Sequence, residues 1–155
     1  MASEVSAGER KQRPIVPFLR LPASAAEKPC LVGQKCKTCG AVYLGSERLG
    51  CSKCTATDSL EEVRLSDRGT LWVYSIVHQS VPGMPVPYVA AIVDLPEGVS
   101  VRCNIVDIEP DPAKIKFGMP VEMVARKVRE RKEKTSEGVE ETIDIIAFFF
   151  KPSQN

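Results

Sequence analysis

Two pairs of cysteines constrain this chain more than any other feature. Cys36 and Cys39 enclose two residues, Cys51 and Cys54 enclose two more, and eleven residues separate the pairs. Each C-x-x-C segment holds two thiolates on one tight turn, and eleven residues suffice for a short hairpin between the turns. Together the pairs can form the tetrahedral sulfur cage that zinc prefers. Gly40 follows the first pair, where the backbone must turn with a positive φ.

The four thiolates predict one structural zinc ion. Four protein ligands leave no coordination position for a water molecule or a substrate, so catalysis at the metal is not expected. Iron fits the same cage, and ligand softness and geometry do not separate the two metals. A redox site would instead have a single C-x-x-C at the start of a helix in a βαβ unit. Of the other two cysteines, Cys103 alternates with apolar residues and is expected in a core. Cys30 could compete for the metal, but the four later cysteines already complete the set.

The composition is that of a globular protein without a strong charge preference. Apolar residues make up 43% of the 155 residues, which is enough for a core, and the formal charge of +1 gives no electrostatic footprint for nucleic acid. The first ten residues lack the apolar stretch of a signal peptide, and the apolar run 145–150 is too short to span a bilayer. Together with free C-x-x-C pairs, this predicts a cytoplasmic location and no membrane contact.

Residues 1–29 are expected to form an irregular or short-helical N-terminal segment that is partly flexible. Residues 1–13 are mostly polar, and prolines at 14, 17, 22 and 29 forbid a long helix. Phe18 and Leu19 would be unusual in a free tail. They are expected either to pack on the core of this chain or to contact a partner protein.

After the cysteines, apolar residues alternate with a period of two, which predicts strands. Five strands are expected, at 62–78 with a kink at Gly69, 88–95, 99–105, 121–126 and 142–148, with a short helical connector at 111–118. Five strands with a helical element between the third and fourth describe an OB-fold barrel. The predicted fold is therefore mainly β: a rubredoxin-like zinc ribbon at 30–58, followed by an OB-fold domain at 59–152.

The order of these segments resembles the acyl-CoA-associated zinc-ribbon/OB-fold proteins, which are small accessory subunits of thiolase-type enzymes. The matching segments are residues 31–40, Cys51 with Cys54, 65–75, 87–98, 117–121 and 148–152. The resemblance implies a non-catalytic subunit in a hetero-oligomer with a thiolase-fold enzyme, which supports assembly and the binding of a coenzyme A thioester. It does not indicate which residues contact coenzyme A, nor the acyl group.

The sequence offers little for independent catalysis. His78 is the only histidine, and no cysteine outside the metal set has a recognisable nucleophile context. A histidine after the alternating strand is more simply a packed or loop-facing residue than a catalytic one. The chain is thus expected not to be catalytic alone. The weaker alternative is a stand-alone acyl-CoA enzyme that depends on His78.

The basic stretch 126–134 leaves a second function open. It holds six basic and two acidic residues, whereas four acidic residues follow at 137–144. An exposed hairpin with oppositely charged strands is the simple interpretation, because cross-strand ion pairs could then form. A phosphate site for coenzyme A or a contact with an acidic partner surface would also fit. The alternative function is an OB-fold protein that binds single-stranded nucleic acid, although such sites interleave aromatic residues and this stretch has none.

The segment from His78 to Val93 contains no charged residue. Within it, the proline-rich loop 79–88 presents Val81, Met84 and Val86. Loops are normally solvated, so a stiff, uncharged loop predicts a contact with a partner subunit or an acyl group. The alternative is that the loop folds over the open end of its own barrel.

Overall fold

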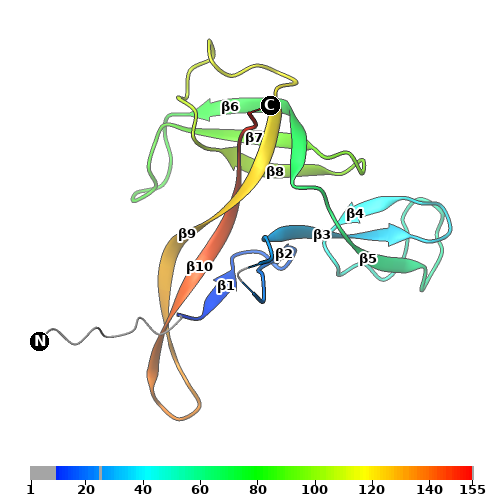
Figure 1. Ribbon diagram of the computed structural model, residues 1–155, viewed down its shortest axis with the longest axis horizontal. Helices are drawn as coiled ribbons and strands as arrows, with labels where there is room; N and C mark the ends of the chain where they lie inside the picture. The colour runs from blue at the N-terminus through cyan, green and yellow to red at the C-terminus, as the bar shows by residue number, and fades with distance from the viewer. Residues whose placement is uncertain (1–9, 25, 155) are drawn as a thin grey trace, which may run out of the picture.

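The computed structural model describes residues 10–24 and 26–154 and is all-β over that range. The predicted looseness of residues 1–9 falls outside the described residues. The strands form two sheets, a six-stranded one that contains the barrel and a four-stranded one that contains the cysteines (Figure 1). In the part of the chain that the structure describes, no helix is long and apolar enough to cross a membrane.

Five strands close into a mixed barrel, which confirms the predicted OB fold. They are β6 (Arg68–Val77), β7 (Tyr88–Asp94), β8 (Ser100–Ile105), β9 (Pro120–Lys134) and β10 (Glu140–Pro152). β6, β7 and β8 form an antiparallel meander, and β9 pairs with both β6 and β10. One parallel pairing, Phe150 with Ile105, joins β10 to β8 and completes the ring. This order is that of the partly open Greek-key barrel of OB folds.

The cysteines lie in the smaller sheet, which we call the ribbon. It consists of β2 (Leu19–Arg20), β3 (Cys30–Cys36), β4 (Val42–Leu44) and β5 (Leu60–Arg64). The prediction of a single strand at 62–78 is therefore wrong. The strand is interrupted at 65–67, and the residues before this interruption form β5, which pairs with β3. The ribbon sheet thus continues past the predicted boundary at residue 58.

The ribbon and the barrel share one hydrophobic core. Phe150, Val93, Val101 and Val121 are fully buried inside the barrel, and the same cluster includes residues from the ribbon and its connections, namely Leu19, Leu31 and Leu65. Leu19 is only 1% exposed, so its assignment as a partner contact is corrected: it packs on this chain. Phe18 is half-buried and meets Phe148 edge to face, with ring centroids 5.7 Å apart. Burial of these side chains ties the two sheets together.

Neither the connector predicted to be helical nor the N-terminal segment expected to be irregular or short-helical forms a helix in the described residues. The connector at 111–118 forms turns, in which the Asp111 carboxylate accepts a hydrogen bond from the backbone N–H of Ala113. Pro112 and Gly118 leave too few residues between them for more than a turn. The N-terminal segment forms two short strands, β1 (Gln12–Pro14) and β2, because β10 and β3 offer backbone partners to it.

Gly69 lies where β6 crosses the end of β7 at close range. A Cβ atom at this position would lie 2.5 Å from the carbonyl oxygen of Asp94 and 2.7 Å from Cγ1 of Val93. Gly69→Ala should lower the free energy of unfolding by about 2–3 kcal/mol, since backbone atoms must move to admit the methyl group. Chemical denaturation measures this change. Ser75→Ala, at an exposed position of the same strand, is the matched control, and equal stability of the two variants would contradict the close packing.

Candidate metal centre

The two C-x-x-C segments form matching turns. In the first, the N–H of Gly40 donates to the carbonyl of Cys36 at 2.8 Å, and Gly40 has a φ of 77°. In the second, the N–H of Thr55 donates to the carbonyl of Cys51 at 2.9 Å, with a φ of 62°. A β-branched residue with positive φ is strained, so the second turn is held in place by its surroundings.

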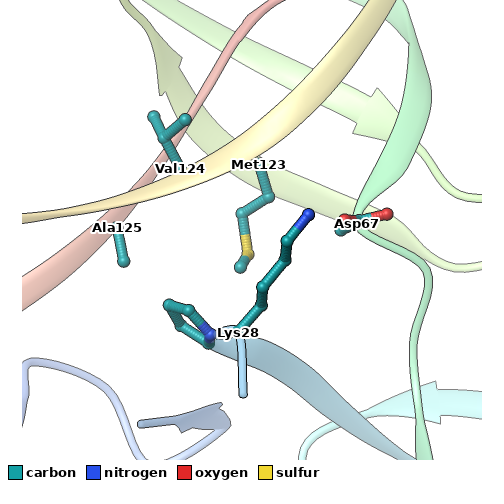
Figure 2. A pocket seen from close by; sticks show the side chains of 6 residues that line it. Lys28, Asp67, Met123, Val124 and Ala125 are labelled. Carbon is teal, nitrogen blue, oxygen red and sulfur yellow. The ribbon is translucent and has the colours of Figure 1, made fainter. Parts of the chain in front are cut away.

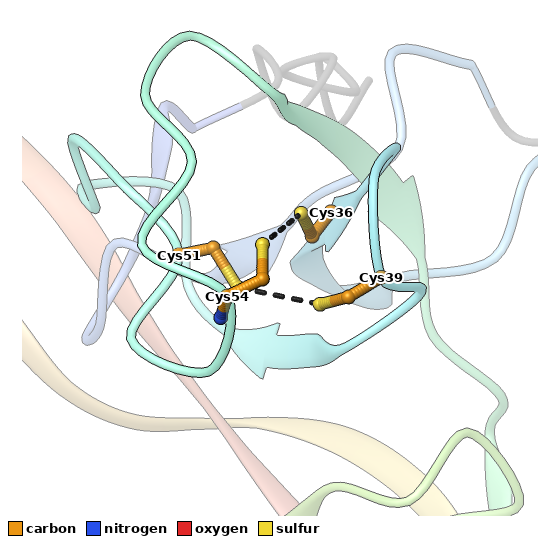
Figure 3. A group of neighbouring side chains, drawn as sticks. All are labelled: Cys36, Cys39, Cys51 and Cys54. Carbon is orange, nitrogen blue, oxygen red and sulfur yellow. Dashed lines mark hydrogen bonds between the residues drawn. The ribbon is translucent and has the colours of Figure 1, made fainter.

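The four cysteine sulfurs converge on one point between the turns (Figure 3). All four ligand atoms lie within 4.8 Å of one another. The closest approaches join one turn to the other: Cys36 Sγ to Cys54 Sγ at 3.6 Å and Cys39 Sγ to Cys51 Sγ at 3.5 Å. Tetrahedral coordination with zinc–sulfur bonds of about 2.3 Å would require sulfurs about 3.8 Å apart. The cluster therefore fits one metal ion with small movements of the side chains.

One cysteine of each pair is hydrogen-bonded to a hydroxyl group and is buried. Ser59 Oγ lies 3.2 Å from Cys36 Sγ, and this contact, followed by backbone N–H groups, lowers the pKa of Cys36 to about 5. The Tyr43 hydroxyl lies 3.3 Å from Cys51 Sγ and is the main cause that lowers the pKa of Cys51 to about 7. Hydrogen bonds of this kind favour the thiolate, which is the form that binds metal.

Four thiolates cannot gather here without a compensating cation. The backbone N–H of Ala56 favours ionisation of Cys54, but desolvation and the neighbouring sulfurs outweigh it and raise the pKa of Cys54 to about 12. Like charges in close contact disfavour one another's ionised forms. A divalent cation at the centre would offset the repulsion between the thiolates. The charge of the four ligands therefore fits a metal ion, as their spacing does.

Tyr43 holds the cage from outside, a role that sequence reasoning missed. Its oxygen accepts hydrogen bonds from Ser52 Oγ at 3.1 Å and from the Lys53 N–H at 3.2 Å, which leaves its own proton for Cys51. Arg48 lies over its ring, 4.2 Å from the centroid, and fixes the ring further. The spacing of the cysteines could not reveal this contact, because it depends on tertiary structure. Tyr43 is held in β4 by pairing with β3, and the turn that carries Cys51 folds against its hydroxyl group.

Tyr43→Phe should therefore weaken metal binding about tenfold, the usual effect of losing a hydrogen bond to a metal ligand. Competition with a chromogenic chelator for zinc measures the affinity. Tyr88→Phe, on the barrel strand β7, is the control and should leave the affinity unchanged. Equal affinities for Tyr43→Phe and the parent chain would show that the hydroxyl does not support the cage.

The remaining cysteines stay outside this cluster. Cys30 is half-buried at the start of β3, and the metal-competent group contains only the four predicted cysteines among the described residues. Cys103 is buried in the barrel, where desolvation raises its pKa to about 12. It is a core residue, as predicted.

A cleft of about 230 Å³ opens where the ribbon meets the barrel (Figure 2). Apolar groups form most of it, with Lys28 and Asp67 as its two charged residues; the lining is Lys28, Pro29, Asp67, Met123, Val124 and Ala125. Figure 2 shows the Lys28 side chain extending past Met123 toward Asp67. Three segments far apart in sequence build this cleft, which is why no sequence motif marks it.

The predicted interface loop is exposed. Val81, Met84 and Val86 are 69%, 46% and 43% exposed, so the loop does not bury these side chains in its own barrel. It projects from the barrel on the side away from the ribbon (Figure 1). His78, at the start of the loop, is exposed as well.

Comparison with known proteins gives the family. The family model "ChsH2, C-terminal OB-fold domain" matches residues 62–126. A "DUF35 domain-containing scaffold protein" of Methanocaldococcus jannaschii is 37% identical over 131 residues, which are 83% of this chain and 86% of that protein. The chain belongs to the DUF35 family. The resemblance predicted from the sequence is thereby confirmed.

Other DUF35 relatives belong to enzyme complexes. Subunit BbsA of benzoylsuccinyl-CoA thiolase from Thauera aromatica is 31% identical to this chain, over 75% of this chain and 76% of BbsA. A solved structure described as "Ltp2-ChsH2(DUF35) aldolase" is 28% identical, superposes with a TM-score of 0.55, and covers 79% of this chain and 84% of the matched one. The similarity thus spans both the cysteine ribbon and the barrel.

Proposed function

We propose that this DUF35 protein is a non-catalytic accessory subunit of a thiolase-type acyl-CoA complex. The similarity to a thiolase subunit over about three quarters of both chains carries the proposal. The relatives described as scaffold proteins support a role in assembly. The shared core of ribbon and barrel suits such a role, since it gives a rigid body that can hold two surfaces at a fixed distance.

We infer that Cys36, Cys39, Cys51 and Cys54 hold one structural zinc ion. All four ligands come from the protein, so the ion would stabilise the ribbon and supply no open position for chemistry. The ribbon strands are short, between two and seven residues, and a bound metal would add the folding free energy that so small a sheet lacks.

Two surfaces serve the complex in this proposal. The loop with Val81, Met84 and Val86 contacts the partner enzyme, because burying its exposed apolar side chains in an interface is favourable. The cleft at Lys28 and Met123 is suited to an apolar part of an acyl-CoA, since most of its walls are apolar and its two charged residues, Lys28 and Asp67, have opposite signs.

Affinity purification of the tagged chain from its native host tests the proposal. A thiolase-type enzyme should be retained in stoichiometric amount, and metal analysis of the same sample should find about one zinc per chain. Retention of single-stranded nucleic acid without any enzyme would instead support the alternative function. Turnover of an acyl-CoA by the isolated chain would contradict an accessory role.

A further inference from the structure

The β9–β10 hairpin continues beyond the barrel as a two-stranded arm, which comprises residues 127–145 (Figure 1). A two-stranded hairpin is marginally stable on its own in water. The arm also carries an unfavourable register, since Glu133 lies directly opposite Glu141 and Glu130 lies directly opposite Asp144. Like charges at such positions destabilise strand pairing.

The structure contains the expected exposed hairpin and a cross-strand ion pair between Lys127 and Asp144, but its register allows fewer such pairs than the charges of the two strands suggest. Within the arm, only Lys134 and Glu140 face each other as opposite charges. A count of charges along each strand could not show this, because the pairing depends on the turn and on a register shift between Ile145 and Ile146.

Lys127 and Arg131 of the arm pair with some of these carboxylates, and further cations come from the other end of the chain. Residues 10–14, which we call the strap, lie along the outer edge of β10, where β1 pairs with it in parallel. Three of the four facing carboxylates have a cation from the strap: Arg13–Glu133, Arg10–Glu130 and Lys11–Glu141, at 2.5, 2.7 and 3.0 Å. Arg13 donates to the two carboxylate oxygens of Glu133 through its Nη1 and Nη2 atoms. Such two-point contacts are stronger than single ones.

The fourth carboxylate is compensated inside the arm. Lys127 Nζ lies 3.1 Å from Asp144, whose side chain is only 14% exposed, and Arg10 approaches the same oxygen at 3.8 Å. The hydrogen bond from Arg13 holds the pKa of Glu133 below its ordinary value. Lys127 first and Arg10 second do the same for the pKa of Glu130. Glu130 and Glu133 therefore stay ionised, and the repulsion within each facing pair must be balanced by cations.

The strap itself is held by few backbone contacts. It has three register pairs with β10, and the N–H of Asp144 donates to the carbonyl of Lys11 at 2.9 Å. The ion pairs are exposed, with about half or more of the Arg10, Lys11 and Arg13 side chains accessible. Exposed ion pairs contribute only about 0–1 kcal/mol each and are weakened by salt. A moderate rise in salt concentration should therefore favour release of the strap.

We propose that residues 10–14 are an electrostatic strap that controls whether the arm is ordered. When the strap is bound, Arg13 and Lys11 neutralise the outer pair, Glu133 and Glu141, while Arg10 adds to the neutralisation of the inner pair that Lys127 bridges, and the two strands stay paired. When the strap leaves, Glu133 and Glu141 lose their strap cations and repel each other, and the outer part of the arm opens. The strap and the arm thus form one switchable element at the end of the barrel.

Hydrogen exchange of the zinc-loaded full chain, followed by mass spectrometry, tests this. In the variant Arg10→Glu/Lys11→Glu/Arg13→Glu, amides of 128–143 should exchange about tenfold faster, as expected from losing three exposed ion pairs of about 0.5 kcal/mol each. Amides of β7 should keep their rates. Arg20→Glu, which breaks a similarly exposed pair with Glu62 in the ribbon, is the matched control and should leave the arm unchanged.

A second background separates charge compensation from simple coverage of the strand edge. With Glu130→Gln and Glu133→Gln in place, the facing carboxylate pairs no longer exist, so the same triple reversal should change arm exchange less than about twofold. A tenfold effect that persists in this background would overturn the proposal. So would an unchanged arm in the first variant, or acceleration of the arm and β7 together.

Discussion

Replacing Cys36 with serine should abolish metal binding and unfold the ribbon. Cys36 is 1% exposed and shares the cage with three other sulfurs, so its loss leaves an open, weakly basic position in the coordination shell. Structural zinc contributes about 10–16 kcal/mol in small zinc-binding peptides, and most of that stabilisation depends on the complete ligand set. We expect less than about a tenth of an equivalent of zinc after gel filtration, compared with about one for the parent chain.

The consequences should extend from the ribbon into the barrel. Leu31 in β3 and Leu65 directly after β5 belong to the core that the ribbon shares with the barrel, so the melting temperature should fall as well. Hydrogen exchange should show loss of protection in β3–β5 first. Cys30→Ser changes a half-buried cysteine of the same strand and should keep the metal. Equal zinc content in both variants would exclude the four-sulfur site.

The features that sequence reasoning predicted are local ones. The spacing of the cysteines gave the cage, because each C-x-x-C turn forms from a few neighbouring residues. Alternation located β7 and β8 to within a residue or so, because one face of each lies in the core, with Val93 and Val101 fully buried.

The features that sequence reasoning missed depend on contacts between residues that are distant in the sequence. β5 looks like the start of a barrel strand, but its residues pair with β3, about thirty positions earlier in the chain. From the sequence alone, Leu19 fits an interface and a core equally well. In the structure it pairs with Leu31 of β3 and is buried. The strap shows the same limit, because its cations match carboxylates more than a hundred residues away.

The cage and the strap act on separate elements of the proposed subunit. A metal in the cage would hold the two cysteine turns of the ribbon together, and the strap lies against the arm, at a separate position (Figure 1). The loop at 79–88 depends on neither, since it connects two strands of the barrel meander. A change in the loop should therefore affect association without affecting either element, which makes it the cleanest site for testing assembly.

Met84→Asp should leave the free subunit intact and weaken its association with the partner enzyme at least a hundredfold. Met84 is 46% exposed and its side chain meets only Ser80 Oγ among the hydrogen-bonding groups, so an aspartate is solvated in the free chain. In an apolar contact the same carboxylate would be buried without a partner, which costs about 3 kcal/mol or more. Titration calorimetry with the purified enzyme measures the affinity, while zinc content and the melting temperature report on the fold.

The matched control is Val139→Asp, which places the same charge on an apolar residue of the arm that is 60% exposed. This variant should bind the enzyme as the parent chain does, because the turn between β9 and β10, which carries Val139, lies far from the loop (Figure 1). If both variants lose affinity equally, added negative charge rather than the loop surface is responsible. If Met84→Asp unfolds the barrel while the surviving protein assembles normally, the loop is part of the core and the interface lies elsewhere.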